Sequence, residues 1–289
     1  MSTHRNSAAV AHVRARAEGP PVPRDLRVTL NFHPDRLHGG RTVLERLKAD
    51  GAYRSQFETG TSNGALSAHP GGARWRWEQR LFGGVYDDAP AAERPKYGAL
   101  NHRRRSIGAA PRFGSAHLRL APHALDHATF CFPDSFFDPE HFGTADRMGL
   151  IALADAFDAR PLSDEIEATE GGLLDDYVEA QVHDVIDLRR DVEAVVLDPC
   201  YRDTDIEAHA RALGVSVEWH EGFRASVEAL RRHPNFRGPH VVALAESIAR
   251  GGVMDPRILG EAAASGAHDP QLLKRVWHML ARFGWAWGR

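Results

Sequence analysis

The sequence predicts an α+β fold, and three observations support this prediction. From about residue 24 to 145, short stretches of alternating apolar and polar residues are separated by loops rich in Gly, Pro, Arg and aromatic residues. From about 146 to 222 helical and strand-like segments alternate, and from about 224 to 289 the pattern is helical. We therefore expect a twisted, mostly antiparallel pair of small sheets with a helical C-terminal part packed on it.

The first strand and the first helix have the clearest signals. The strand is predicted over residues 26–33, where apolar residues alternate with polar ones and His33 comes last. In the helix that follows, Thr42 and Glu45 have the spacing of a capping box, and Gly51 is a C-terminal stop signal. Residues 53–111 then show little periodicity, which is typical of a functional or disordered loop, and the many aromatic residues in this stretch argue against disorder.

The later elements follow from the same two periodicities. The predicted strands cover residues 112–120, 127–132, 176–188, 193–198 and 215–219. The predicted helices cover residues 147–157, 204–214, 238–252 and 269–284.

Composition excludes several classes of protein. The chain has 289 residues, 43% of them hydrophobic and 26% charged, with a formal net charge of -3, and nothing in these values indicates a nucleic-acid or anionic-membrane partner. Two cysteines, Cys131 and Cys200, exclude a disulfide framework and a four-thiolate zinc site, and indicate folding in a reducing compartment. No apolar run approaches the roughly 18 residues that a membrane span needs.

The domain organisation is predicted to be simple. Residues 1–23 form an unstructured or helical lead-in that ends at a proline-rich break, and residues 24–289 form a single domain whose C-terminal part, from about 224, is helical. The lead-in has no apolar core, so it is not an ordinary secretory signal, although this does not exclude delivery by a specialised secretion machine.

Polar faces on three predicted strands suggest a cleft. In residues 176–188 the valines and alanine alternate with Tyr177, Glu179, Gln181 and His183, which fall together on the opposite face. The polar faces of the other two strands hold His33 and Ser115. One wet strand face is ordinary, but three such faces beside a long Gly- and aromatic-rich segment indicate a binding cleft.

The motifs that carry these residues resemble a known family. "FHPDR", "YRSQFETGTSNG", "RPKYGALN", "PRFGSAHLRL" and "DYVEAQVH", spread over about residues 27–200, together resemble a bacterial family long catalogued as a domain of unknown function. That family includes mono-ADP-ribosyltransferase effectors that modify a threonine of host ubiquitin. The resemblance implies split antiparallel sheets around an NAD cleft, additional C-terminal helices, NAD+ as co-substrate without a metal, and ubiquitin as partner. It also implies synthesis in a bacterial cytoplasm and delivery to host cells by a specialised secretion system.

The resemblance also implies roles for particular residues. Glu179 is the candidate catalytic residue, because a carboxylate beneath the reacting ribose stabilises positive charge and accepts a proton from an attacking hydroxyl. Gln181 follows Glu179, which differs from the order in arginine-modifying relatives and argues against an arginine acceptor. The candidates for NAD binding are His33, Arg36, Thr61, Ser62, Asn63, Tyr97, Arg112, Phe113 and Ser115, and the sequence does not choose between His33 and Arg36 for the first-strand role.

Other interpretations stay open at this level. Gln181, Trp75 and Trp77 are candidates for the acceptor site, since Trp and neighbouring Arg residues favour protein interfaces, but a buried anchor is the alternative for the tryptophans. Glu179 on its own is equally typical of a solvated edge strand. No H-E-x-x-H motif or compact Cys/His cluster is present. A metal-dependent hydrolase and a non-catalytic ubiquitin- or peptide-binding module are the alternative functions.

Overall fold

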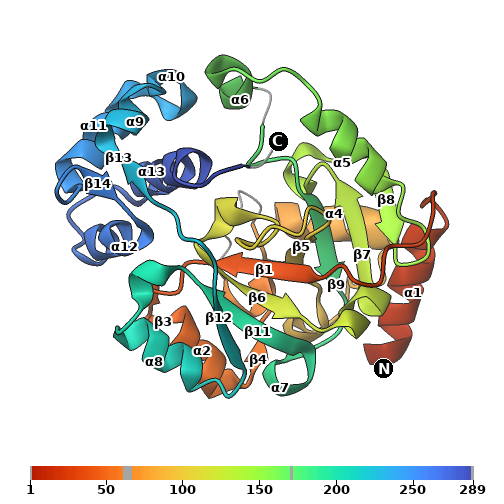
Figure 1. Ribbon diagram of the computed structural model, residues 1–289. Helices are drawn as coiled ribbons and strands as arrows, with labels where there is room; N and C mark the ends of the chain where they lie inside the picture. The colour runs from red at the N-terminus through yellow and green to blue at the C-terminus, as the bar shows by residue number, and fades with distance from the viewer. Residues whose placement is uncertain (1, 61–66, 170–171, 288–289) are drawn as a thin grey trace.

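The computed structural model describes residues 2–60, 67–169 and 172–287, and it confirms the mixed α+β class (Figure 1). A large central sheet dominates the fold, and its neighbouring strands are antiparallel except for one parallel pair at an edge. In spatial order the strands are β12 (Ser216–Trp219), β11 (Val192–Leu197), β6 (Ala116–Leu120), β1 (Val28–Phe32), β5 (Lys96–Leu100), β9 (Val178–Val182), β7 (Ala128–Phe132) and β8 (His141–Thr144).

The prediction of two separate small sheets is replaced by one sheet that opens at one end. β1 and β5 are paired only at Val28 with Leu100 and at Thr29 with Ala99. Beyond this point β1 continues to pair with β6 as far as Phe32, while β5 continues to pair with β9 as far as Lys96. β1 and β5 therefore separate after a short paired stretch, and the sheet divides there into two halves.

Helices and short two-residue strands complete the fold. The helices are α1 (Ser2–Arg14), α2 (Val43–Asp50), α3 (Gln56–Thr59), α4 (Ala73–Phe82), α5 (Leu150–Asp158), α6 (Asp164–Thr169), α7 (Leu188–Asp191), α8 (Asp205–Arg211), α9 (Val227–Arg231), α10 (Pro234–Arg237), α11 (Pro239–Ile248), α12 (Pro256–Ala264) and α13 (Pro270–Phe283). The two-residue strands pair as β2 (Leu37–His38) with β3 (Arg41–Thr42), β4 (Ala52–Tyr53) with β10 (Ile186–Asp187), and β13 (Ala225–Ser226) with β14 (Val253–Met254). A 3₁₀ turn, η2 (Pro111–Phe113), precedes β6.

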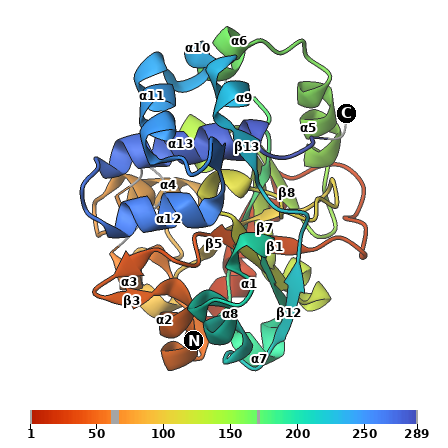
Figure 2. The same cartoon turned by 60° about the vertical axis from the view of Figure 1, so that its left-hand side comes forward.

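Four apolar clusters hold these elements together, and three of them are large. Because side chains alternate along a strand, Phe130 and Phe132 of β7 enter one cluster, with α2, α5 and α8, while Cys131 enters another, with α1 and α4. The sheet is therefore covered on both faces. The third cluster lies within α9–α13 and includes Ile107 and Leu174 from outside this bundle. In Figures 1 and 2 the blue C-terminal helices pack beside the open end of the sheet.

The structure defines two segments whose form the sequence left open. The aperiodic stretch 53–111 contains the helix α4 and the central strand β5. The lead-in before residue 24 forms α1, which packs against α4 and β8, and its Ala9 and Val13 are fully buried. Among the described residues, no helix is both long enough and apolar enough to cross a bilayer.

The capping box predicted for α2 is confirmed. The Thr42 hydroxyl accepts the backbone N–H of Glu45 at 3.2 Å, the Glu45 carboxylate accepts the backbone N–H of Thr42 at 2.7 Å, and Gly51 ends the helix in a left-handed conformation. These bonds satisfy backbone donors that the first turn of a helix leaves without partners.

Replacing Thr42 with Ala should lower the free energy of unfolding by about 1 kcal/mol, because the N-cap acceptor is lost. Urea unfolding followed by circular dichroism measures this change as a lower midpoint at an unchanged slope. Lys48→Ala, at an exposed position of the same helix, is the control and should stay within about 0.5 kcal/mol. Equal stabilities of the two variants would contradict a stabilising role for the cap.

Candidate functional site

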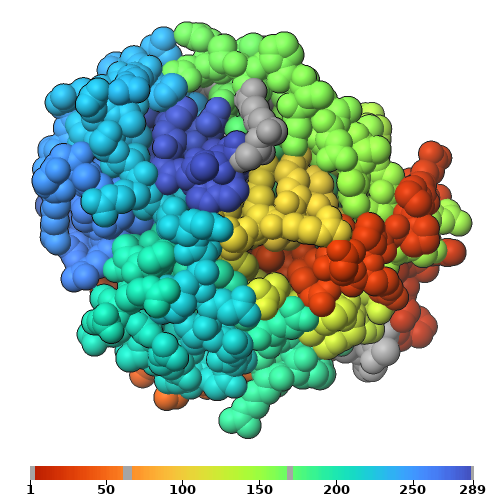
Figure 3. All heavy atoms as spheres, in the orientation of Figure 1, coloured from red at the N-terminus to blue at the C-terminus, as the bar shows by residue number. Residues whose placement is uncertain are grey.

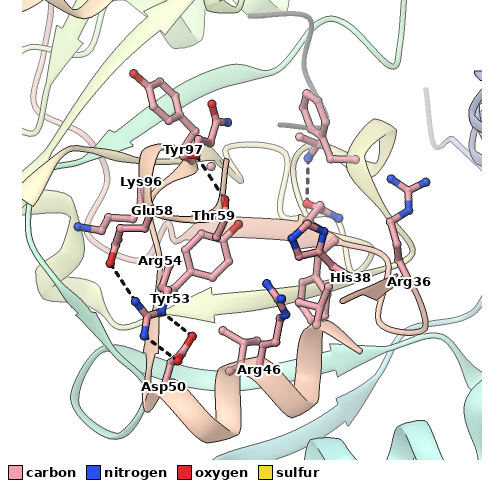
Figure 4. A pocket seen from close by; sticks show the side chains of 18 of the residues that line it. Arg36, His38, Arg46, Asp50, Tyr53, Arg54, Glu58, Thr59, Lys96 and Tyr97 are labelled. Atoms are coloured by element: carbon pink, nitrogen blue, oxygen red, sulfur yellow. Dashed lines mark hydrogen bonds and ion pairs between the residues drawn. The ribbon is translucent and has the colours of Figure 1, made fainter. Parts of the chain in front are cut away.

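A cavity of about 870 Å³ lies where β1 and β5 separate (Figure 4). Its walls come from β1, β5, α2, the β2–β3 hairpin, α4 and the residues after β7. Gly98 of β5 lines the cavity next to β1, and a Cβ atom there would lie 2.4 Å from the Leu30 side chain. The volume is in the range of pockets that hold small-molecule ligands and cofactors.

Positively charged side chains predominate on the cavity wall. The basic lining residues are Arg36, Arg41, Arg46, Arg54, Arg74 and Lys96, and the acidic ones are Asp50, Glu58, Asp134 and Glu179. Figure 4 shows Arg54 held between Asp50 and Glu58 on one side of the cavity and Arg36 on the other. The excess of guanidinium groups favours an anionic ligand such as one that carries phosphate.

Glu179 of β9 lines this cavity and is only 6% exposed. Its Oε2 atom accepts hydrogen bonds from the Ser135 hydroxyl at 2.8 Å and from the Ser135 backbone N–H at 3.3 Å. Its Oε1 atom accepts the Gln181 amide N–H at 3.0 Å. The carboxylate is thus held by two partners in a fixed orientation, with an edge of the cavity in front of it.

Opposing effects act on the pKa of Glu179. Burial raises this pKa above its ordinary value, because a carboxylate loses its hydration when it leaves water. The nearby Arg74 guanidinium and the hydrogen bonds from Ser135 and Gln181 oppose the rise, while the Asp134 carboxylate adds to it. The result is a carboxylate whose pKa lies above that of an exposed glutamate.

Arg74 of α4 is the charge partner of this site. It is 4% exposed, its Nη1 atom donates to the Ser135 hydroxyl at 2.7 Å, and its guanidinium lies 4.0 Å from the centre of the Tyr97 ring. Tyr97 in turn donates its hydroxyl proton to Glu78 at 2.8 Å, and Glu78 is paired with Arg94 at 2.6 Å. The cation beside Glu179 is therefore fixed by an extended buried network.

A second chain of hydrogen bonds leads to Glu179 from the other end of β9. Burial lowers the pKa of His183 to about 3, so its imidazole is neutral and carries a single N–H. The Thr129 hydroxyl donates to the Gln181 side-chain oxygen at 2.9 Å, and His183 Nε2 lies 2.8 Å from the same hydroxyl. The Tyr86 hydroxyl lies 2.9 Å from His183 Nδ1. One assignment connects these side chains: Tyr86 donates to His183, His183 to Thr129, Thr129 to Gln181, and Gln181 to Glu179, while the Tyr86 hydroxyl also lies 3.3 Å from Asn6 Oδ1.

One family model matches the chain at residues 27–160 and again at residues 147–283. The family is described as protein of unknown function (DUF3626). The chain belongs to this family. No curated protein matches the sequence. The matched residues include the sheet, the cavity and the C-terminal helices, so the family covers the whole site, while ADP-ribosyl transfer stays a prediction.

In this DUF3626 protein the two first-strand candidates lie in different surroundings. Arg36 lines the cavity. His33 is not a lining residue: its ring packs edge-on against Trp277 of α13, with centroids 4.8 Å apart. Burial and the Arg36 charge lower the pKa of His33 to about 3, so its imidazole is neutral. The geometry therefore places Arg36, rather than His33, on the cavity wall.

The predicted NAD-binding residues near β6 also differ in whether they line the cavity. Phe113 lines the cavity and packs edge-on against Tyr177, with centroids 5.7 Å apart. Ser115 is fully buried and does not line the cavity; its carbonyl lies 2.7 Å from His220 Nε2. Arg112 forms an ion pair with Asp175 and is also outside the lining. Only Phe113 of this group borders the cavity.

The remaining predicted site residues differ in how they relate to the cavity. Tyr97 lines the cavity, but Arg74 covers one face of its ring, so a nicotinamide must use another face or displace the guanidinium. Trp77 is a core residue, 4% exposed, and Gln181 is fully buried; neither presents a surface to a protein acceptor. Trp75 is half-buried on α4. The predicted ligand residues Thr61, Ser62 and Asn63 lie outside the described residues.

Sequence reasoning missed Ser135, Asp134 and the role of Arg74. Asp134 accepts the Tyr177 hydroxyl, and the Asp-Ser pair directly follows β7, whose Cys131 lies opposite Glu179 in the sheet. Had the predicted strand over residues 127–132 been paired with the predicted strand over residues 176–188, Ser135 would have been expected near Glu179. Among the described residues, no group of three or more His, Cys, Asp or Glu side chains has the arrangement of a metal site.

Replacing Arg74 with Met should raise the pKa of Glu179 further and destabilise the protein, because the buried carboxylate loses its positive partner. Removing one member of a buried charge pair costs about 3–5 kcal/mol. The loss of stability should be greater at pH 8 than at pH 5. A carboxyl group whose pKa is higher in the folded than in the unfolded protein favours folding at low pH, where it is protonated, and this contribution is lost as pH rises.

Urea unfolding at the two pH values measures this difference. Arg76→Met removes an exposed arginine from the same helix and is the matched control. A pH-independent loss, equal in the two variants, would show that Arg74 does not compensate the Glu179 charge.

Proposed function

We propose that this protein is an NAD-dependent mono-ADP-ribosyltransferase. The observation that carries the proposal is the position of Glu179: a buried, hydrogen-bonded carboxylate on the wall of a cation-lined cavity that lies where two strands separate. The cavity is of a size that suits a dinucleotide, and its guanidinium groups suit the diphosphate. Each of the five motifs of the resemblance contributes at least one described residue to the cavity wall: Arg36, Tyr53, Tyr97, Phe113 and Glu179 are examples.

The chemistry assigned to the site needs a single carboxylate. The bond between C1′ of the ribose and the nicotinamide nitrogen breaks, nicotinamide leaves with the bonding electrons, and positive charge develops on the ribose. The Glu179 carboxylate stabilises this charge. An acceptor hydroxyl then forms the new bond to C1′ and transfers its proton to Glu179, whose raised pKa makes it a better base than an exposed glutamate.

The acceptor is proposed from the sequence resemblance alone. It is a protein hydroxyl, specifically a threonine of ubiquitin, and its modification would block ubiquitin conjugation. The burial of Trp77 and Gln181 removes two of the residues predicted to contact the acceptor. The acceptor surface in this proposal is therefore the rim of the cavity, including the β2–β3 hairpin, whose Leu37 is 53% exposed.

Glu179→Gln should reduce NAD turnover by about 100-fold or more, because the isosteric amide neither stabilises the ribose cation nor accepts the proton. Purified protein is incubated with NAD and ubiquitin, nicotinamide release is measured, and ubiquitin is weighed by intact-mass spectrometry. Glu228→Gln, an exposed glutamate of α9, is the control and should act like the unaltered protein.

The outcomes separate the alternatives. Nicotinamide release without a mass change on ubiquitin would keep the transferase and remove ubiquitin as acceptor. Activity that a chelator abolishes would favour a metal-dependent hydrolase. Ubiquitin binding that survives Glu179→Gln, together with no NAD turnover by the unaltered protein, would favour a binding module and disprove the proposal.

Arg36→Ala should weaken NAD binding by about tenfold or more, since a guanidinium–phosphate interaction is a charge-assisted hydrogen bond. Calorimetric titration of the Arg36→Ala and His33→Ala variants, each checked for folding by circular dichroism, measures the two effects side by side. If only His33→Ala weakens binding, the first-strand role belongs to His33 and the assignment of Arg36 is wrong.

A further inference from the structure

A cluster of basic side chains lies where the C-terminal helices meet the sheet. Lys274, Trp277 and His278 are three and four residues apart and so share one face of α13. The Trp277 indole N–H lies 3.0 Å from the carbonyl oxygens of Pro111 and of Arg112, which seats this face on η2. Figure 3 shows the blue C-terminal residues in contact with the yellow segment to which η2 belongs.

The charges of this cluster act on one another. Burial, and after it the charges of Arg112, Arg237 and Lys274, lower the pKa of His278 well below its ordinary value. Burial, followed by Arg112, lowers the pKa of Arg237 to about 10. Burial, Arg112 and Arg36 lower the pKa of Lys274. A positive field therefore extends from the cavity rim at Arg36 to α13.

Two carboxylates belong to the same cluster. Asp175 pairs with Arg112, and Glu167 pairs with Arg282 at 2.6 Å while also lying near Arg237. Guanidinium and ammonium groups gathered in this way are suited to binding an anion.

His278 provides an independent indication of a ligand. It is 5% exposed, and its Nδ1 atom accepts the Arg237 Nε–H at 3.3 Å. A neutral imidazole that accepts at Nδ1 carries its proton on Nε2. Among the described residues this buried Nε2–H has no hydrogen-bond partner. A buried donor next to guanidinium and ammonium groups is suited to an oxygen of an anion.

We propose that Lys274, His278, Arg237 and Arg112, which lie beside the cavity rather than on its wall, form an anion site that binds the phosphate groups of a nucleotide extending from the cavity. This assignment rests on the proposed function, which makes that nucleotide NAD. Arg112 belongs to the same 3₁₀ turn as Phe113, which lines the cavity, and Arg36 lines the cavity while acting on Lys274. The site gives the C-terminal helices a direct role in substrate binding.

The test is calorimetric titration of the full-length protein with inorganic pyrophosphate, ADP-ribose and nicotinamide. Lys274→Gln and Arg237→Gln should each weaken pyrophosphate and ADP-ribose by about tenfold or more and leave nicotinamide unchanged, because each removes a charged donor to phosphate. Arg232→Gln removes one exposed charge from the same bundle and should change none of the three affinities. Circular dichroism confirms that every variant is folded.

The outcomes distinguish this inference from the proposed function. Unchanged ADP-ribose and pyrophosphate affinities in both folded variants would overturn the anion site, while binding of ADP-ribose would leave the transferase in place. Pyrophosphate binding that depends on Lys274, in a protein that binds neither ADP-ribose nor NAD, would overturn the transferase and the assignment to nucleotide phosphates. Equal losses in Arg232→Gln would mean that overall charge, rather than the cluster, sets the affinity, and would also overturn the inference.

Discussion

The burial of the Glu179 carboxylate is the constraint on which much of the structure depends. A buried carboxylate is strongly destabilising unless hydrogen bonds and a positive charge compensate it. Ser135 and Gln181 donate the bonds, and Arg74 carries the charge. Each partner needs partners of its own, so Tyr97 holds Arg74 and Thr129 holds Gln181. Three strands, β5, β7 and β9, and the helix α4 are thereby fixed relative to one another although they lie far apart in the sequence.

The polar side chains of β1 have a different role, because they attach a neighbouring segment that forms part of the cavity wall. Thr29 accepts the Ala109 N–H at 2.9 Å, and Asn31 donates to the Ile107 carbonyl at 2.9 Å. These bonds attach the segment 107–114 to β1 and so position η2. Gly114 lies so close to β1 that a Cβ atom there would be 1.9 Å from the Phe32 carbonyl carbon. Short polar side chains and a glycine thus set the cavity wall beside β1.

The sequence predicted local features better than their environment. The capping box at Thr42, the alternation in the strand of Glu179 and the helix over residues 269–284 all follow from spacing, and the structure confirms them. Spacing does not tell whether a polar strand face meets water or other polar groups. The face of Glu179 is therefore typical of an exposed edge strand in sequence and is central and buried in the fold.

Helix α4 could not be predicted for a related reason. Its buried face carries Arg74 and Glu78 beside Trp77 and Leu81, so the apolar periodicity that identifies an amphipathic helix is interrupted. Those charged residues are buried because their partners lie on other elements, and only the tertiary structure brings the partners together. The same long-range pairing explains why Ser135 was missed, since its role depends on the register between β7 and β9.

The burial that organises the site also determines what chemistry it is suited to. An exposed glutamate is ionised at neutral pH but is a weak base, and a fully desolvated one would be protonated and unable to stabilise a cation. Arg74 and the donors from Ser135 and Gln181 limit the rise in the pKa of Glu179 that desolvation causes. In the proposed reaction one group both stabilises positive charge and accepts a proton, and the buried network around β9 opposes the desolvation that would otherwise favour the protonated carboxyl.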